Sequence, residues 1–167
     1  MVSRMVDITE ISAVVAAAGV LIGVVYYVLD LRRQSIMRQT ELTTRLFSVF
    51  ATEEFQKEWF TFMEEETNDY KVLRKKYGLE IPPTALFFNE IGILLGKKLI
   101  DVDLVYSLFG SVILRYWERA RPLLESGRKM LNQPTWGWGL EYLANIIKKR
   151  EQTLQRSIKQ KLQQSKA

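Results

Sequence analysis

Residues 11–29 read ISAVVAAAGVLIGVVYYVL, and this run decides the fold of the chain. It contains no charged residue, and only Ser12, Tyr26 and Tyr27 carry a polar side-chain atom. As an α-helix the run would be ~28 Å long, close to the ~30 Å hydrocarbon core of a bilayer. The sequence therefore predicts a transmembrane helix, marked by Ile11, Ala16, Gly19, Gly23, Tyr26, Tyr27 and Leu29.

Two other interpretations of this run are weaker. A cleaved signal peptide has a basic start, but Arg4 is offset here by Asp7 and Glu10, and the run ends on bulky residues instead of small ones. A helix that is apolar on every side could also be buried, which would require a large domain around it. The remaining ~135 residues could scarcely surround it and still bury their own apolar faces. We therefore favour a membrane anchor.

The basic residues beside the run predict its orientation. Arg32, Arg33, Arg38 and Arg45 follow it, whereas Arg4 alone precedes it. Lys and Arg collect on the cytoplasmic side of a span, and the absence of cysteine fits a reducing compartment. We expect a plasma (inner) membrane protein with an extracytoplasmic N-terminus over residues 1–10, a transmembrane helix over 11–29, a cytoplasmic helical domain over 30–147 and a basic C-terminal helical tail over 148–167.

Small residues share one face of the predicted span. Ser12, Ala16, Gly19 and Gly23 recur at spacings of four, three and four residues. Such patterns let two helix backbones approach closely in lipid, although glycine is common in transmembrane helices in any case. The face is a weak indication that the span pairs with a second copy.

The rest of the chain reads as helix, because glycine and proline are few and no stretch shows sustained alternation with period two. We expect the anchor helix to continue to Phe50 and a second helix to follow, N-capped by Thr52. A third helix should cover residues 68–77 and stop at Gly78, and a fourth should run from Pro82-Pro83 to about Leu95. A fifth helix should begin after Asp101 and be bent or broken at Gly110 and Pro122, followed by a loop over 126–135 and a final helix from 136–140 into the tail. Helical spacing predicts that the core includes Leu42, Leu46, Val49, Phe50, Phe55, Trp59, Phe62, Met63, Leu86, Phe87, Ile91, Leu94, Leu95, Leu104, Val105, Leu108, Ile113 and Leu114. The predicted fold class is all-α: an N-terminal transmembrane helix that continues into a small cytoplasmic helical bundle with a long basic C-terminal helix.

The composition excludes several kinds of active site. The chain has no histidine and no cysteine, so Ser-His-Asp and Cys-His catalysis, zinc sites with those ligands, and the usual haem or iron–sulfur ligation are excluded. The acidic run Glu64-Glu65-Glu66 with Asp69 fans around a helix end and is best explained as a solvated surface. We predict no catalytic, cofactor-binding or metal-binding residue, no cofactor and no small-molecule ligand. An enzyme with a carboxylate-based site is an alternative.

The segment from Ile91 to Val105 resembles a helix-turn-helix motif in its apolar and small positions. The helix that would enter the DNA groove begins with Asp101 and Asp103 and has no basic residue before Arg115. Two carboxylates there would be repelled by the phosphate backbone. A membrane-tethered nucleic-acid-binding protein is therefore an alternative that ranks below a helical hairpin with a packing role, and we do not expect nucleic acid as a partner.

Gly92 and Gly96, followed by Lys97 and Lys98, superficially resemble a phosphate-binding loop. Three residues separate these glycines where that loop has four, and no Ser or Thr follows the lysine. The segment also belongs to a predicted apolar helix and follows no strand. We expect the two glycines to allow close helix packing instead.

Residues 87–124 read FFNEIGILLGKKLIDVDLVYSLFGSVILRYWERARPLL, and they carry a family resemblance. The glycine-bearing helix, the Ile-Asp-x-Asp-Leu-Val turn, the Leu-Phe-Gly step and Arg-Tyr-Trp-Glu before Arg-Pro resemble a family of prokaryotic single-pass membrane proteins with a domain of unknown function. The similarity extends over roughly residues 34–150. It implies an N-terminal anchor and a small α-helical cytoplasmic domain, and it implies no activity.

A group of residues within that segment is a candidate interaction patch: Arg115, Trp117, Arg119 and Arg121. Arg115 and Arg119 are i,i+4 neighbours that could bind an anionic group. Glu118 could equally pair with Arg115 or Arg121 as an ordinary surface network, and this structural interpretation is the one we prefer.

Trp136 and Trp138 alternate with Gly137 and Gly139. The two indole rings could sit at the membrane interface or fill the core of the domain. We favour the core.

The last segment is strongly basic. Residues 148–166 hold seven basic residues and one acidic residue, a net charge of +6, whereas the whole chain carries +5. A narrow apolar stripe runs along it: Leu143, Ile147, Leu154, Ile158 and Leu162. Such a helix could lie on anionic lipids, form a coiled coil or remain in solvent. The lipid-contacting residues would be Lys148, Lys149, Arg150, Arg156, Lys159 and Lys161.

These observations predict a single-pass membrane protein of unknown biochemical activity. Its cytoplasmic domain would act as a non-enzymatic interaction or scaffold module. The expected partners are the lipid bilayer and either another protein or a second copy of the chain.

Overall fold

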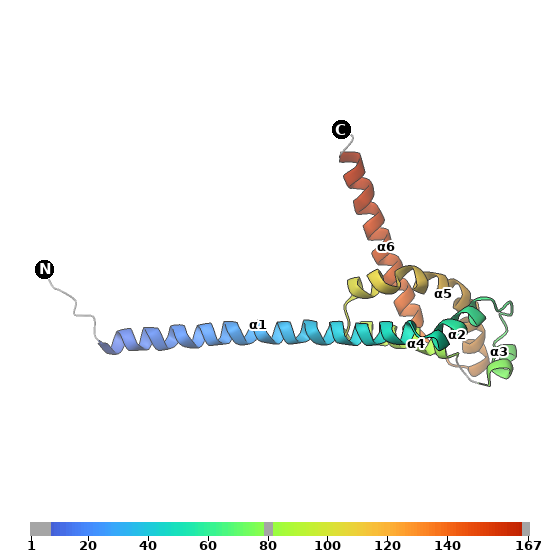
Figure 1. Ribbon diagram of the computed structural model, residues 1–167, viewed down its shortest axis with the longest axis horizontal. Helices are drawn as coiled ribbons and strands as arrows, with labels where there is room; N and C mark the ends of the chain where they lie inside the picture. The colour runs from blue at the N-terminus through green and yellow to red at the C-terminus, as the bar shows by residue number, and fades with distance from the viewer. Residues whose placement is uncertain (1–7, 79–81, 165–167) are drawn as a thin grey trace. The chain divides into compact units, whose positions relative to one another are not determined.

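The computed structural model describes residues 8–78 and 82–164, and within them it contains six helices and no strand. The helices are α1 (Ile8–Phe50), α2 (Glu53–Met63), α3 (Tyr70–Tyr77), α4 (Pro83–Gly96), α5 (Val102–Leu131) and α6 (Trp138–Gln164) (Figure 1). The chain divides into two compact units, Met1–Glu41 and Leu42–Ala167. The predicted all-α fold class is confirmed.

The first unit is the greater part of α1. The helix is continuous from Ile8 to Phe50, which confirms that it extends beyond the apolar run. Every side chain from Ile11 to Leu29 is exposed, and an 18-residue window of this helix has a mean hydropathy of 2.3. Within the described residues, this is the one helix that is long and apolar enough to cross a membrane.

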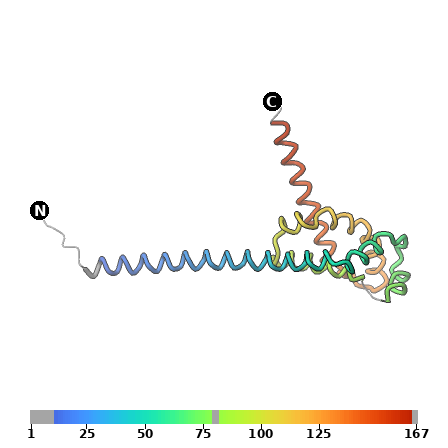
Figure 2. The backbone as a smooth tube through the Cα atoms, viewed as in Figure 1, coloured from blue at the N-terminus to red at the C-terminus, as the bar shows by residue number. Residues whose placement is uncertain are grey.

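The second unit is built around α6, which packs against both α4 and α5 (Figure 2). The fully buried side chains are largely aromatic and aliphatic: Phe88, Ile91, Val105, Phe109, Ile113, Tyr116, Leu140, Leu143 and Ile147. The last turns of α1 contribute Leu46 to this core, and Phe50 packs against it with its ring 5.4 Å from that of Phe109.

The capping residues expected from the sequence are present. The Thr52 hydroxyl accepts a hydrogen bond from the Phe55 amide at 3.3 Å, and the Asp101 carboxylate accepts from two amides at the start of α5. Gly78 closes α3 with φ 65°, a conformation that costs glycine little. α3 itself begins at Tyr70, two residues later than predicted, because Asp69 caps it.

The C-terminal part of α5 differs from the prediction. The loop expected over 126–135 is wrong, because the helix continues through its first half and ends at Asn132, which has φ 53°. Contacts with the following segment stabilise this extension. A Cβ on Gly127 would lie 2.6 Å from the Trp136 ring, and the Arg128 guanidinium donates to the Trp136 carbonyl oxygen at 2.9 Å.

α5 is one continuous helix through Gly110 and Pro122, so the break that was one of the two expectations there is absent. Pro122 is exposed, so the carbonyl oxygen that lacks its usual amide partner lies on the solvent side. A proline on that side removes one hydrogen bond without displacing packed side chains.

Some predicted core positions are wrong. Val49, Leu86 and Leu108 are 49%, 49% and 38% exposed. Thr43 and Phe88 are fully buried, and each lies one position after a residue that was expected in the core. A shift of one residue turns a helix by ~100°, so small errors in the assumed face exchange buried for exposed positions.

α4 and α6 approach each other closely at Gly92 and Gly139. A Cβ on Gly92 would lie 1.8 Å from the carbonyl oxygen of Gly139, and one on Gly139 would lie 2.4 Å from the carbonyl oxygen of Asn89. The Asn89 side-chain oxygen also accepts a hydrogen bond from the Leu140 amide at 3.3 Å. Close packing is therefore confirmed at Gly92, whereas a Cβ on Gly96 would make only ordinary van der Waals contacts, the nearest at 3.5 Å.

A buried polar pair lies within this core. The Tyr116 hydroxyl and the Thr84 hydroxyl are 3.0 Å apart, and the two residues are 0% and 1% exposed. Burial raises the pKa of Tyr116 well above its usual value, because the phenolate would be taken out of water, while the Thr84 hydrogen bond acts in the opposite direction.

The raised pKa of Tyr116 predicts a loss of stability in alkaline solution. Below pH ~10, the ordinary pKa of tyrosine, this side chain is protonated in both folded and unfolded chains and has no effect. Above that pH the unfolded chain loses the proton while the folded chain keeps it, so the free energy of unfolding falls by up to ~1.4 kcal/mol per pH unit. We expect the free energy of unfolding of the Tyr116→Phe variant to fall less steeply with pH than that of the native chain, and the difference in slope should correspond to about one proton. Denaturant unfolding across that pH range measures both slopes. Equal slopes would contradict this assignment.

Candidate functional site

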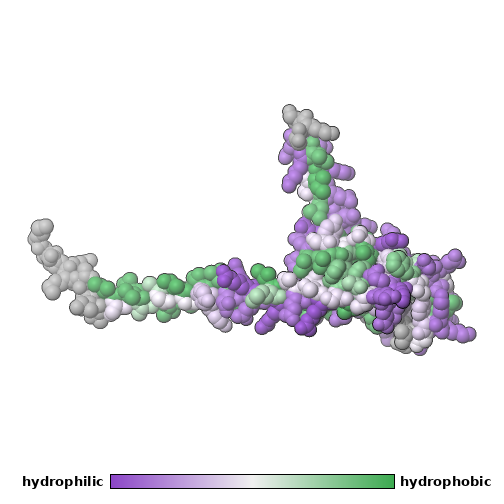
Figure 3. All heavy atoms as spheres, in the orientation of Figure 1, coloured by the Kyte–Doolittle hydropathy of each residue, from purple (hydrophilic) through white to green (hydrophobic). Residues whose placement is uncertain are grey.

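The exposed apolar part of α1 is the first candidate surface. Its side chains remain uncovered on all sides, with Val14 69% and Tyr26 72% exposed, and Figure 3 shows hydrophobic residues along this stretch. A Cβ on Gly19 or Gly23 would meet no atom within 4 Å, so the small-residue face is not occupied by this chain. Pairing through that face stays a prediction.

The candidate arginine patch is distributed over different contacts. Arg119 on α5 contacts the loop between α2 and α3. Its guanidinium donates to the Asn68 side-chain oxygen at 2.9 Å and to the Thr67 carbonyl oxygen at 2.8 Å. The same group lies 5.3 Å from the centre of the Phe62 ring, within the range of a cation–π contact. Arg119 therefore ties α5 to the loop that joins α2 and α3.

The other members of the patch have separate neighbours. Arg115 lies 5.6 Å from the Trp59 ring centre, and Trp117 is half-buried against the core. Arg121 is exposed and donates to Glu125 one turn later at 2.9 Å. Binding of an anionic group by these residues stays a prediction.

Removal of Arg119 should destabilise the helical domain. Hydrogen bonds from a charged donor contribute about 1.5–3 kcal/mol, so Arg119→Ala is expected to lower the free energy of unfolding by about 2 kcal/mol. Arg121→Ala is the matched control, because its exposed i,i+4 pair contributes about 0.3–0.5 kcal/mol. Denaturant unfolding of both variants measures the difference, and equal midpoints would show that Arg119 does not hold the loop.

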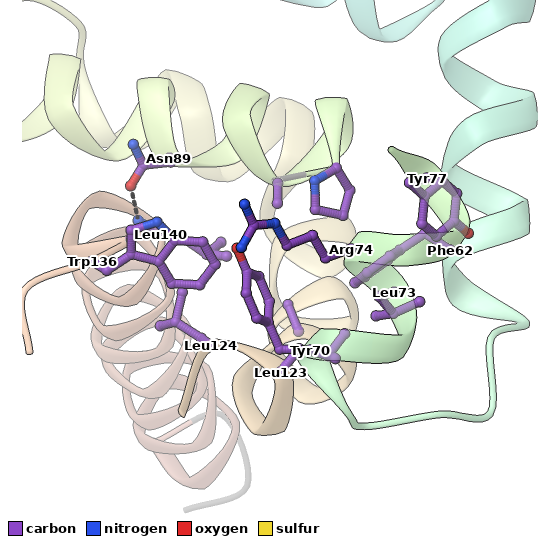
Figure 4. A pocket seen from close by; sticks show the side chains of 14 residues that line it. Phe62, Tyr70, Leu73, Arg74, Tyr77, Asn89, Leu123, Leu124, Trp136 and Leu140 are labelled. Carbon is purple, nitrogen blue, oxygen red and sulfur yellow. Dashed lines mark hydrogen bonds between the residues drawn. The ribbon is translucent and has the colours of Figure 1, made fainter. Parts of the chain in front are cut away.

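A small apolar cavity lies between α3 and the ends of α4, α5 and α6. Its volume is about 70 Å³, and residues that face it include Tyr70, Arg74, Leu124 and Trp136 (Figure 4). An apolar cavity of about 150 Å³ is needed to hold a molecule the size of benzene. This cavity is therefore too small for a ligand the size of a cofactor.

The two tryptophans of the Trp136–Gly139 segment have different environments. Trp136 is half-buried, and its ring centre lies 5.3 Å from that of Tyr70. Trp138 is 44% exposed and packs beside Tyr142. The expectation of a core position fits Trp136 and is wrong for Trp138.

The helix-turn-helix-like segment serves packing and an ion pair. Gly92 lies at the close contact with α6, and Asp103 at the start of α5 lies 2.5 Å from the Nε of Arg150. One carboxylate of the would-be recognition helix is thus paired within the chain. This is the packing role that we preferred for the hairpin.

One carboxylate of the acidic run is paired within the chain as well. The Lys76 ammonium donates to the Glu65 carboxylate, which lowers the pKa of Glu65 and raises that of Lys76. Glu64 and Glu66 are exposed. Among residues 8–78 and 82–164, no three acidic side chains gather closely enough to hold a metal ion.

The exposed end of α6 is the second candidate surface. Leu143 and Ile147 are fully buried, but Ile158 and Leu162 are 55% and 57% exposed on the same helix. Figure 3 shows this as a narrow hydrophobic stripe between hydrophilic edges. The apolar stripe of α6 therefore continues beyond the domain that covers its first half.

These features define an all-helical protein in which a long apolar helix precedes a small helical domain. The model of the family described as a domain of unknown function, DUF4760, matches residues 13–148, and the chain belongs to this family. The match begins inside the apolar run, earlier than the resemblance noted from residue 34 onward. No curated protein and no solved structure matches the chain.

Proposed function

We propose that the chain is a single-pass protein of the plasma (inner) membrane, with residues 11–29 as the span, the N-terminus outside and the helical domain in the cytoplasm. The observation that carries this proposal is the complete exposure of the apolar run. Burial of a Val, Leu or Ile side chain is favourable by about 1.5–3 kcal/mol, so such a helix favours an apolar environment that the chain itself does not supply. A bilayer supplies it.

Two further observations support this reading. The family match includes most of the run together with the domain, as expected if the two parts function as one unit. Arg32, Arg33 and Arg38 follow the run and favour a cytoplasmic domain.

The domain would act as a non-enzymatic module that binds another protein. Its core residues are packed against one another, and the apolar cavity beside α3 is too small for a ligand of cofactor size. An adaptor function requires only an accessible surface held at the membrane. Crosslinking in membranes, followed by purification of the full chain, would identify a partner; the absence of any crosslinked species would count against this module.

The anchor and its orientation can be tested with single cysteines, because the chain has none of its own. In intact cells a membrane-impermeant maleimide should label Ser3→Cys but not Glu118→Cys, and it should label Glu118→Cys after permeabilisation. The full-length chain should also stay in the membrane after alkaline carbonate washing. A mature protein that begins after residue 29, or release by carbonate, would overturn the proposal.

A further inference from the structure

We infer that residues 148–164 of α6, here named the tail helix, lie on the anionic lipid surface that faces the helical domain. The inference rests on the proposed function, because it requires a membrane on the side of the domain. It adds a second membrane contact to the span, made by a different part of the chain and by different chemistry.

The first observation is the uncovered apolar stripe. Leu154 is half-buried, and Ile158 and Leu162 follow it at intervals of four residues with more than half of each side chain exposed. The same stripe is fully buried at Ile147, where α6 packs in the domain. The tail helix therefore presents an apolar edge that is ready to enter the headgroup region of a bilayer.

The second observation is the charge around this stripe. The tail helix holds six basic residues and one acidic residue. At ~100° per residue, Lys159 lies on one flank of the stripe and Lys161 on the other. Their long stems can lie against lipid while the ammonium groups reach the phosphates. Each such residue near an anionic leaflet raises the affinity for the surface about fivefold.

The base of the tail helix is fixed to the domain. Arg150 pairs with Asp103 on α5, and Ile147 one turn earlier is fully buried. Residues beyond Arg150 extend from this point without buried apolar contacts. The helix is therefore held at one end and available along the rest of its length.

A lipid surface fits the tail helix better than a second copy of the chain. Two tail helices would each bring an excess of positive charge, and like charges repel. Coiled coils alternate apolar spacings of three and four, whereas Leu154, Ile158 and Leu162 are separated by four and four. An anionic leaflet complements the charge and accepts a narrow stripe.

Because the span already anchors the chain in the bilayer, binding of the tail helix to the same bilayer would be nearly intramolecular. Residues 30–41 join the predicted span to the second unit, and even a fully extended chain of that length reaches only ~40 Å. A tether this short keeps the lipid surface at high effective concentration around the domain. A weakly binding tail helix can therefore stay on the surface.

The test uses the full chain in lipid nanodiscs and an environment-sensitive dye on a single cysteine. Ile158→Cys places the dye on the stripe, and Gln160→Cys places it on the opposite side as the matched control. We expect the dye at 158, but not at 160, to report an apolar environment when phosphatidylglycerol is mixed into the phosphatidylcholine disc. K159Q/K161Q should lower the ratio of lipid-bound to free tail helix about 25-fold, whereas replacement of the exposed pair, K71Q/K75Q, should leave this ratio unchanged.

Each outcome decides one question. The same signal at 158 with and without phosphatidylglycerol would overturn the inference, and so would equal signals at 158 and 160. A signal that appears in pure phosphatidylcholine only when two chains share a disc would identify a second copy as the occupant and overturn it too. Failure of the chain to enter phosphatidylcholine discs would contradict the span, whereas entry with an unresponsive dye would refute only the lipid contact of the tail helix.

Discussion

Gly92→Ala is expected to remove a large part of the stability of the helical domain. The new methyl group would lie 1.8 Å from the carbonyl oxygen of Gly139 and 2.4 Å from its carbonyl carbon. Both atoms belong to the backbone of α6, so no side-chain rotation can relieve the overlap. The two helices would have to separate along their shared core, at a cost of about 3 kcal/mol or more. Natural domains have only about 5–15 kcal/mol in total.

Gly96→Ala is the matched control on the same helix. A methyl group there approaches its nearest neighbour only to 3.5 Å, an ordinary van der Waals contact, and alanine favours the helical conformation more than glycine does. Thermal unfolding of the full chain in detergent, followed by near-ultraviolet circular dichroism of the tryptophans, should show Gly96→Ala at or above the native midpoint. Gly92→Ala should unfold far below it. Similar midpoints for the two variants would mean that the α4–α6 contact is looser than described.

Gly137→Ala should have the second-largest effect. Gly137 has φ 68°, where a side chain costs about 1–2 kcal/mol, and its Cβ would lie 2.2 Å from Cδ1 of Leu124. Leu124 is a buried residue of α5 that also faces the cavity beside α3, so rotation of its side chain can relieve part of this overlap. We expect the backbone strain and the remaining overlap together to lower the free energy of unfolding by about 2–3 kcal/mol.

Gly78→Ala separates the two contributions to that loss. Gly78 has nearly the same backbone conformation, φ 65°, but a Cβ there would meet no atom within 4 Å. Its replacement should therefore cost only the conformational part, about 1–2 kcal/mol. Denaturant unfolding of both variants gives the difference directly. If Gly78→Ala were as damaging as Gly137→Ala, the overlap with Leu124 would contribute nothing.

Local signals in the sequence predicted the boundaries of most helices. Thr52 and Asp101 were identified as N-caps and Gly78 as a stop, because each satisfies backbone groups within its own turn. The end of α5 could not be found in this way. Its last turn depends on Gly127 and Arg128 meeting Trp136, and a tertiary contact of this kind leaves no periodic pattern.

The candidate surfaces were predictable to different degrees. The apolar run and the basic tail are continuous in sequence, so their composition alone identifies them. The contact of Arg119 with the loop between α2 and α3 could not be predicted, because its partners Asn68 and Thr67 lie about fifty residues away in the chain. Close packing at Gly92 was predicted from the glycine itself, whereas its partner Gly139 on α6 was not identified, because the two residues lie far apart in the chain.

The contact between Gly92 and Gly139 also sets the order of events during synthesis. α4 lacks its most extensive helix contact until α6 has been made, and α6 enters the core about ninety residues after α1 ends at Phe50. At typical translation rates this interval lasts about 5–20 s. α1 therefore leaves the ribosome while the core of the domain is still incomplete, and under the proposed function its delivery to a membrane can precede folding of the part that it carries.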